Sequence, residues 1–388
     1  MSSWRKVTLE NVAVIERSTI QPEAISQGTA YVGLEHIESG GAILGAKKVE
    51  EGELASSKFK FTECHLLYGK LRPYLAKIAC PDFSGICSTD ILPILPGPEL
   101  ERRFLCYFLR QPSMVEHANS RAVGANLPRL SPSALAEFEI PLPPVVEQRR
   151  IAEVLDRAEA LRAKRRAALA QLDSLTQSLF LDLFGDPATN PKGWPKATLA
   201  DVTEMATGYP FRSEEYVTSR DSVRLCRGAN ILPGRIDWRD LARWPASKKA
   251  ELADFNLKAG DVVIAMDRPW ISEGFKIAQV QPEDCPALLV QRVARLRGRN
   301  EMPNEYLFHL LNQPAFTRHC RPTETTIPHI SPKDIRSFAF PVPPIELRRE
   351  FARRVTAVEK LKTAQRASLA ELDALFATLQ HRAFRGEL

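Results

Sequence analysis

Hydrophobic residues recur every three or four positions along two long stretches of the chain, residues 147–186 and 347–388. This spacing, held for about five heptads, is typical of helices that pair in a coiled coil. Gly and Pro are absent from 145–184 and from 345–385. The pattern therefore predicts two helices of about 35 residues, each about 50 Å long at 1.5 Å per residue. The predicted apolar seam includes Ile151, Val154, Leu161, Leu172, Leu175, Leu361, Leu372 and Leu375.

The two stretches are copies of one sequence. Adding 200 to a residue number in 127–186 gives its counterpart without a gap, for example Pro128 and Pro328, or Phe184 and Phe384. A repeated unit of this kind dictates the architecture, and each seam needs an apolar partner. We predict that the two helices pack antiparallel about a pseudo-two-fold axis, because that arrangement makes the two halves of the chain equivalent. Parallel packing is the alternative.

Each copy interrupts its seam with a polar residue at the same place, Arg165 in the first and Gln365 in the second. In an antiparallel pair these midpoint residues face each other, and one polar contact in an apolar seam sets the register at some cost in stability. The alternative is that both side chains extend their polar ends into water.

The segments before the two helices share an order of parts. SWRKVTLENV at 3–12 matches GWPKATLADV at 193–202, and an apolar strand followed by Arg-Pro-aromatic occurs at Arg72 and again at Arg268. Short helices ended by Gln-Pro follow in both halves. The order predicts an α+β protein with two globular mixed α/β domains, 1–146 and 187–346, a central spacer helix at 147–186 and a C-terminal spacer helix at 347–388.

Composition places the chain among ordinary globular proteins. Of its 388 residues, 44% are hydrophobic and 26% are charged, which fits two or three domains. The sequence has no run of about 18 apolar residues, and MSSWRKVTLE does not have the pattern of a signal peptide. The seven cysteines form no Cys-x-x-Cys pair, which favours free thiols over disulfides or zinc ligands. We expect a cytoplasmic protein with no membrane partner.

The order of parts also resembles a known family. LRPYLAKIACPDFSGICSTDILPILP, the helix starts PLPPVVEQRRIAEVLD and PVPPIELRREFARRV, and the helix end SLTQSLFLDLFGDP together resemble the specificity subunit of type I restriction-modification systems. The resemblance covers essentially the whole chain. It implies two target-recognition domains that each read one half of a split double-stranded DNA site, with two antiparallel helices between them as a ruler.

The same resemblance implies partners and cofactors. Two methyltransferase subunits would dock on the helices and modify adenine at N6 with S-adenosylmethionine. Motor-nuclease subunits, which use ATP with Mg, would be added for restriction. This chain would bind none of these cofactors and would have no catalysis of its own.

A ruler also follows from geometry. Two modules held at the ends of a rod have a fixed separation, and modules in major grooves on one face of DNA lie whole turns apart, about 34 Å for one turn. A rod of roughly 50 Å can hold such centres. Because most side chains differ between the two globular halves, the target should be bipartite and asymmetric.

The net charge of +6 favours a nucleic-acid partner only weakly, so a DNA surface has to come from the placement of individual side chains. The first candidates follow apolar strands at Pro-containing turns, where an exposed loop can reach DNA. The alternative is that Pro and the aromatic residue pack on the domain while Arg covers them. These candidates are Lys70, Arg72, Tyr74, Arg268, Trp270 and Lys276.

Further candidates are polar residues at strand ends and in the loops before the long helices. Asn, Gln and Arg can make paired hydrogen bonds to base edges, and Arg and Lys can hold phosphates. Solvated strand ends have the same composition, so a purely structural role is the alternative. These residues are Glu35, His36, Asn126, Arg129, Arg227, Asn230, Gln291, Arg292 and Thr325.

Catalytic and metal-binding motifs are missing. The Pro-Pro pairs are in LPPV and VPPI rather than in a methyltransferase tetrad, GGAILGAKK at 40–48 lacks the end of a phosphate loop, and the seven histidines have no ligand spacing. We therefore predict no catalytic residue and no metal site. Two alternatives remain: a coiled-coil scaffold whose globular domains bind protein, and an enzyme that acts on DNA by itself.

Overall fold

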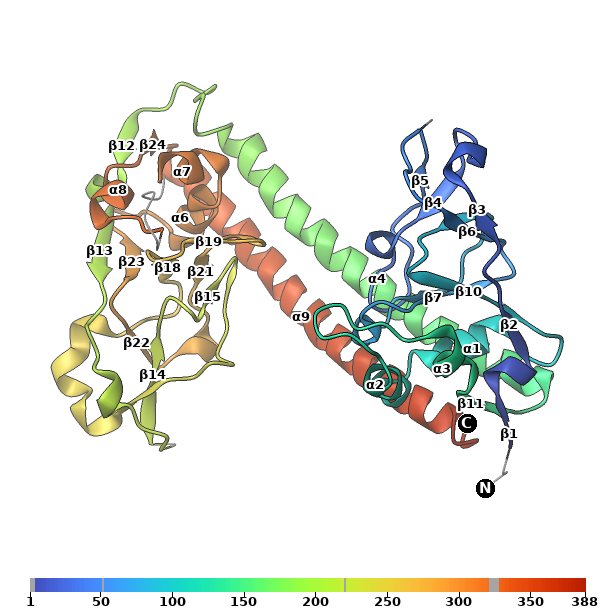
Figure 1. Ribbon diagram of the computed structural model, residues 1–388. Coiled ribbons are helices and arrows are strands. Elements are labelled where there is room, and N and C mark those ends of the chain that lie inside the picture. Colours follow the sequence, from blue (N-terminus) through green and yellow to red (C-terminus); the bar gives the residue numbers. More distant parts are fainter. Residues whose placement is uncertain (1–3, 51, 220, 321–327) are drawn as a thin grey trace. The chain divides into compact units, whose positions relative to one another are not determined.

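The computed structural model describes residues 4–50, 52–219, 221–320 and 328–388. It divides into two compact units, which are described separately. Unit 1 consists of residues 1–166 and 367–388, and unit 2 consists of residues 167–366. Each unit therefore contains one globular part together with a portion of both long helices (Figure 1).

Two long helices follow the Pro-rich segments, as the sequence predicts. Helix α4 (Val145–Phe184) has 40 residues and helix α9 (Ile345–Ala383) has 39. Both begin directly after a Pro-Pro pair, because Pro fits the start of a helix but not its interior. At 1.5 Å per residue each helix is about 60 Å long, longer than the expected 50 Å. Among the described residues, no helix is both long and apolar enough to cross a membrane.

In unit 1, the segments of α4 and α9 pair antiparallel. Arg162 of α4 bonds Asp373 of α9, with 2.6 Å between Nε and Oδ1. Arg150, further toward the start of α4, donates to the carbonyl of Leu388 at 2.9 Å. The contact nearer the start of α4 is therefore made with a residue later in the C-terminal segment. This order confirms the predicted antiparallel orientation within this unit.

The segments in unit 2 pair in the same way. Lys362 of α9 contacts Asp173 of α4 at 2.8 Å, and the rings of Phe351 and Phe180 lie 5.6 Å apart. The antiparallel orientation is therefore confirmed in this unit too. The predicted contact between Arg165 and Gln365, like the pseudo-two-fold axis, joins unit 1 to unit 2 and stays a prediction.

The predicted seam is wrong in part. Leu161, Leu175, Leu361 and Leu375 are 50%, 51%, 54% and 48% exposed. The buried row of α4 instead contains Leu155, with Thr176 and Phe180 further along.

The error has a simple geometric cause. On a helix with 3.6 residues per turn, the third and fourth residues after a buried one lie on either side of the same line. Hydrophobicity alone favours Leu161 over Arg162 and Leu175 over Thr176 as seam residues. In the structure Leu161 and Leu175 are exposed, whereas Arg162 is partly buried and Thr176 is buried. Ile151 is buried as predicted, and Val154, Leu172 and Leu372 are partly buried.

Each unit holds a cation at a position between its two helix segments where a coiled coil normally has an apolar residue. Arg162 in unit 1 is partly buried, and Lys362 in unit 2 is buried. In unit 1, Arg162 lies 4.4 Å from the centre of the Phe376 ring and pairs with Glu159 and Asp373. A cation on an aromatic face between two carboxylates is well compensated for its loss of water. The side chain therefore fills a seam position despite its charge.

Unit 2 repeats this arrangement at the position 200 residues later. Lys362 is buried and pairs with Glu359 at 2.7 Å and with Asp173 at 2.8 Å. Both units therefore join their two helix segments by an ion pair.

The globular part of unit 1 is a mixed α/β module built on two sheets. A four-stranded sheet has the order β2-β10-β7-β8, and a five-stranded sheet has the order β3-β6-β9-β4-β5 with β4 parallel to β9. Strand β1 pairs with β11. The elements are β1 (Arg5–Thr8), β2 (Ala13–Ile15), β3 (Thr19–Ile20), β4 (Ala30–Val32), β5 (Lys47–Lys48), β6 (Lys58–Phe61), β7 (Leu66–Gly69), β8 (Ile78–Ala79), β9 (Gly85–Cys87), β10 (Ile91–Pro96), α1 (Arg102–Leu109), α2 (Pro112–Ser120), α3 (Pro132–Ala136) and β11 (Glu139–Leu142).

The globular part of unit 2 repeats the four-stranded sheet of unit 1, but in the described residues its second sheet has three strands in the order β17-β14-β22 instead of five. Its four-stranded sheet has the equivalent order β13-β23-β18-β21, β14 runs parallel to β22, and β12 pairs with β24. The elements are β12 (Lys196–Thr198), α5 (Leu199–Val202), β13 (Thr203–Thr207), β14 (Ser222–Cys226), β15 (Ile231–Leu232), β16 (Arg235–Ile236), β17 (Arg243–Pro245), β18 (Val262–Ala265), β19 (Trp270–Ile271), β20 (Gly274–Phe275), β21 (Ile277–Gln279), β22 (Ala287–Leu289), β23 (Val293–Gly298), α6 (Asn304–Leu311), α7 (Pro314–His319), α8 (Pro332–Arg336) and β24 (Ala339–Pro341).

A short helix attaches each globular part to the long helices. In unit 1, Phe104 and Phe108 of α1 contact Phe384, at 5.1 and 5.4 Å between ring centres. In unit 2, Tyr306 of α6 contacts Phe184 at 5.0 Å. Aromatic pairs at these separations add to the free energy of burial, so they fix the short helix on the long ones.

Buried side chains also hold the start of each long helix. Gln148 donates to the carbonyls of Glu99 and Pro143, both at 2.8 Å. The equivalent Arg348 donates to the carbonyl of Pro343 at 2.9 Å. The Pro-rich segment is thereby bonded to the first helical turn in both copies.

The corrected seam predicts unequal effects of two similar substitutions. Leu155→Ala should lower the free energy of unfolding of unit 1 by about 2–5 kcal/mol, because it opens a cavity in the core. Leu161→Ala should change it by less than about 1 kcal/mol, because that side chain is half exposed. Urea denaturation followed by circular dichroism measures both. A larger loss for Leu161→Ala would contradict the corrected seam.

His309 predicts an acid-sensitive unit 2. Its ring lies 5.3 Å from Phe351, and burial, followed by the nearby charge of Lys362, lowers the pKa of His309 from 6.5 to about 4. The unfolded chain therefore binds this proton at higher pH than the folded chain. The stabilisation is present above pH 6.5 and is lost as the pH falls toward 4, by up to about 3 kcal/mol.

Urea midpoints between pH 7 and pH 4 test this dependence on pH. His309→Tyr introduces the residue found at the equivalent Tyr107 of unit 1, and it should remove this contribution. An unchanged pH profile in that variant would rule out His309 as the cause.

Candidate nucleic-acid interface

Three loops meet in unit 1. The amide of Arg72 donates to the carbonyl of Pro128 (2.7 Å), that of Lys70 to Asp90 (2.9 Å), and that of Leu130 to Lys70 (3.0 Å). These bonds join the turn after β7, the turn between β9 and β10, and the loop before α3. We call this set, residues 70–74, 89–90 and 123–130, the unit 1 loop cluster.

Unit 2 contains the same arrangement. The amide of Arg268 donates to the carbonyl of Pro328 (2.8 Å), that of Met266 to Arg292 (2.9 Å), and that of Ile330 to Met266 (2.9 Å). The equivalent distances in the two units differ by at most about 0.1 Å. We call residues 266–270, 291–292 and 328–330 the unit 2 loop cluster. Candidates that the sequence places far apart are thus brought together in both units.

The Arg-Pro turns share an uncommon backbone conformation. Arg72 has φ 51° and Arg268 has φ 44°, in the left-handed region that costs a non-glycine residue about 1–2 kcal/mol. Each is held there by its bond to a Pro carbonyl, with a further Pro following it. Both Arg side chains are exposed. Strain of this kind gathers at functional sites, which favours a binding role for these turns.

The remaining unit 1 candidates differ in the exposure and in the hydrogen bonds of their side chains. Tyr74 is 51% exposed, Asn126 is exposed, and Lys70 is half-buried. Arg129 makes two bonds to the carboxylate of Asp90, at 2.9 and 3.3 Å, and this pairing raises the pKa of Arg129. No local pattern in the sequence points to this pair, because its members lie 39 residues apart.

The structure corrects two candidates in unit 2 and shows the packing of a third. Asn230 is buried and donates to the backbone carbonyls of residues 237 and 240, so its amide is occupied in the fold. Lys276 is buried, and that burial lowers its pKa. Trp270 packs on Phe275, with 4.4 Å between ring centres. The predicted DNA contacts of Asn230 and Lys276 are therefore wrong, since both side chains are buried. Trp270 is only partly buried, so its contact with DNA stays a prediction.

The other strand-end candidates have mixed surroundings. Glu35 is exposed, whereas His36 is half-buried and accepts from the amide of Gly33 at 3.0 Å through Nδ1. Arg227 pairs with Asp240 at 2.9 Å. Thr325 lies outside the described residues. Gln291 and Arg292 are exposed, and their role is argued below.

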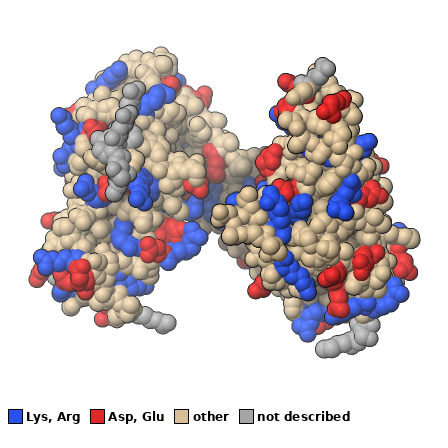
Figure 2. Space-filling model, in the orientation of Figure 1, with Lys and Arg blue, Asp and Glu red and all other residues tan. Residues whose placement is uncertain are grey.

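Charge alone does not mark the interface. On the face drawn in Figure 2, Lys and Arg are interspersed with Asp and Glu in each unit. Among the described residues no group of three or more His, Cys, Asp or Glu side chains could hold a metal ion.

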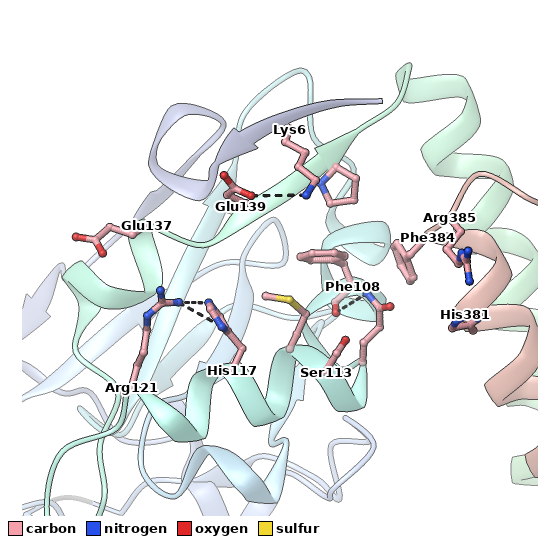
Figure 3. Close-up of a pocket in the computed structure, with 13 residues that line it drawn as sticks. Lys6, Phe108, Ser113, His117, Arg121, Glu137, Glu139, His381, Phe384 and Arg385 are labelled. Carbon is pink, nitrogen blue, oxygen red and sulfur yellow. Dashed lines mark hydrogen bonds and ion pairs between the residues drawn. The ribbon is translucent and has the colours of Figure 1, made fainter. Parts of the chain in front are cut away.

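A cavity of about 650 Å³ in unit 1 lies apart from the loop cluster, between α2, β11 and the end of α9 (Figure 3). Some of its polar side chains contact one another: Lys6 lies 3.7 Å from Glu139, and Arg121 contacts His117.

Two copies of one mixed α/β module, each followed by a long helix and each carrying the same loop cluster, define a duplicated two-module protein. The chain belongs to the family of type I restriction modification DNA specificity domains, whose family model matches residues 1–171 and 191–373.

Named relatives agree with this family. The chain is 33% identical over 160 residues to the specificity subunit of the type I restriction enzyme EcoAI of Escherichia coli, which covers 41% of this chain and 27% of that protein. It is 24% identical over 269 residues to the MjaVIII specificity subunit of Methanocaldococcus jannaschii, covering 66% of this chain and 63% of that protein. The chain thus spans 27% and 63% of the lengths of these two relatives.

Solved structures share the fold along the whole chain. The S subunit of the type I restriction-modification system from M. genitalium matches with a TM-score of 0.61 and 16% identity, over 98% of this chain and 96% of that one. A chain from a study of complex assembly and conformational transition of the type I R-M system matches with a TM-score of 0.56 and 23% identity, over 100% and 99%. The predicted fold class is therefore confirmed.

Proposed function

We propose that this chain is the non-catalytic, sequence-specific DNA-binding subunit of a type I restriction-modification complex. It reads a bipartite asymmetric site and directs partner adenine-N6 methyltransferase and restriction subunits to that site. The observation that carries the proposal is the pair of loop clusters, in which equivalent backbone hydrogen bonds hold different side chains.

Different side chains on one scaffold are what two readers of unlike half-sites require. Arg72 and Arg268 occupy equivalent strained turns with exposed guanidinium groups, which suit phosphate oxygens or guanine. Their surroundings differ, with exposed Tyr74 beside the first and packed Trp270 beside the second. Common turns thus set the approach to DNA, while variable residues choose the bases.

The helices suit a spacer and a docking site. At about 60 Å each, two helices can keep a set distance between readers and so define an unread spacer. In unit 1, Leu161 and Leu375 lie at one level of the pair, near the Arg162–Asp373 contact. Residues two apart on a helix point about 200° apart, so these leucines face away from Glu159 and Asp373 on their own helices.

Leu175 and Leu361 form the equivalent apolar flank in unit 2, next to the Lys362–Asp173 contact. An exposed apolar row on a helix pair is a site for partner helices. We assign these flanks to the two methyltransferase subunits. S-adenosylmethionine, and ATP with Mg, would then be bound by the partner subunits.

The proposed DNA-binding function predicts that two equivalent substitutions weaken binding to different half-sites. Arg72→Ala should weaken binding through one half-site, and Arg268→Ala through the other, each by about 1–3 kcal/mol. Methylome sequencing of a host that carries the complex identifies the target. Fluorescence anisotropy with either half-site scrambled, at several salt concentrations, then measures each variant.

The wild-type affinity should fall steeply with salt, because phosphate contacts release counterions. Binding that is insensitive to salt would contradict a DNA-binding role. A single substitution that alters both half-sites would contradict separate readers.

The docking proposal predicts that charge on the apolar flank blocks assembly. A variant with Leu161→Asp and Leu375→Asp should lose co-purification with the methyltransferase, because two carboxylates would have to be buried in the interface. Its fold should persist, since both side chains are about half exposed. The matched control, Ala163→Asp with Ala377→Asp, places the same charges on exposed positions two residues away, and it should assemble normally. Equal loss in both variants would argue against the leucine flank.

A further inference from the structure

The turn between β22 and β23 carries Gln291 and Arg292, and the equivalent turn of unit 1 carries Thr89 and Asp90. The two turns share one backbone hydrogen bond, since the carbonyls of Arg292 and Asp90 each accept an amide at 2.9 Å. Their backbones are otherwise different, because Arg292 has a left-handed φ and Asp90 does not. The side chains differ in size and in charge. The two loop clusters therefore differ in chemistry at this position.

The turn in unit 2 is held firmly. The backbone N–H of Gln291 donates to the carbonyl of Tyr209 at 2.9 Å, and Arg292 has a left-handed φ of 66°. A Cβ at Gly208 would lie 2.2 Å from the backbone of Val290. Glycine is therefore required for the segment before Tyr209 to approach this turn. The backbone of Gln291 is thus positioned before any ligand arrives.

The side chain of Gln291 is available to a ligand. The side-chain amide of Gln291 is exposed and makes no hydrogen bond among the described residues. The side chain of Arg292 is 65% exposed, and its Nε lies 3.7 Å from a carboxylate oxygen of Asp267. Asp90, by contrast, is held by two bonds from Arg129. Paired donors and acceptors are needed to read a base edge, and Gln291 has both free.

A recess of about 290 Å³ opens beside Gln291. Its apolar lining comes from Gly208, Met266, Ile330 and Pro332, with Gln291 and Arg292 also bordering it. Met266 and Ile330 are buried and bonded to each other through their backbones at 2.9 Å, so the floor is part of the scaffold.

We propose that Gln291 and this recess read one A·T base pair in the major groove. The Gln291 amide would bond N6 and N7 of adenine, and the recess would receive the 5-methyl group of the paired thymine. In the major groove these groups distinguish A·T from the other pairs. The inference rests on the proposed DNA-reading function and adds to it a specificity-determining residue and a base.

Selection from a double-stranded DNA library with a randomised target tests this reading, with the full chain assembled on its methyltransferase. Gln291→Ala should reduce the preference for A·T at one position of one half-site by roughly 10-fold. Gln291→Glu should move that preference toward C·G, because a carboxylate accepts from cytosine N4. For Gln291→Ala the slope of affinity against salt should stay that of wild type, since neither Gln nor Ala carries a charge.

Two controls sharpen the result. Thr89→Ala, at the equivalent turn of unit 1, should leave this position unchanged. Replacing the proposed thymine by uracil removes a single methyl group, and it should weaken wild-type binding by about 4-fold.

The outcomes separate this inference from the function on which it rests. If wild type shows no sequence preference, the proposed function fails. If wild type is selective but Gln291→Ala keeps every preference, or uracil binds as well as thymine, the assignment of Gln291 and its recess is overturned.

Discussion

The aromatic contact between each globular part and the two long helices is the interaction on which the rest of the structure depends. In unit 2, the rings of Phe180, Phe184, Tyr306 and Phe351 form one cluster, with centres 5.0–6.5 Å apart. These rings come from α4, α6 and α9, so a single buried cluster joins both helix segments to the module. Loops that must meet DNA in a set orientation need a rigid base of this kind.

Duplication explains how one scaffold can serve two recognition tasks. Backbone bonds such as Arg72 to Pro128 and Arg268 to Pro328 are shared, because they depend on chain conformation and not on side-chain identity. Side chains at the turns are under no such constraint and have diverged, as at Asp90 and Arg292. Side chains at these turns can therefore change without rebuilding the fold.

Much of the architecture could be predicted from local patterns. Pro-Pro pairs mark the helix starts because Pro cannot continue a strand or helix interior. The Arg-Pro turns were found because they recur at Arg72 and Arg268. The failures have a common cause: Lys276 and Asn230 read as polar surface residues in the sequence. Burial of Lys276, and bonds from Asn230 to distant carbonyls, depend on segments that the local pattern does not reveal.

The repeat alone was enough to establish two modules, two long helices and their equivalence, because periodicity and a constant offset of 200 are properties of the chain. Packing decided the rest. Which of Leu161 and Arg162 faces the partner helix depends on the Phe376 ring and the Asp373 carboxylate opposite them, since both positions fit a helical period of 3.6 residues. Likewise, that Asp90 is bound to Arg129 while Gln291 stays free follows from contacts between residues distant in sequence. Such contacts exist only once the chain has folded.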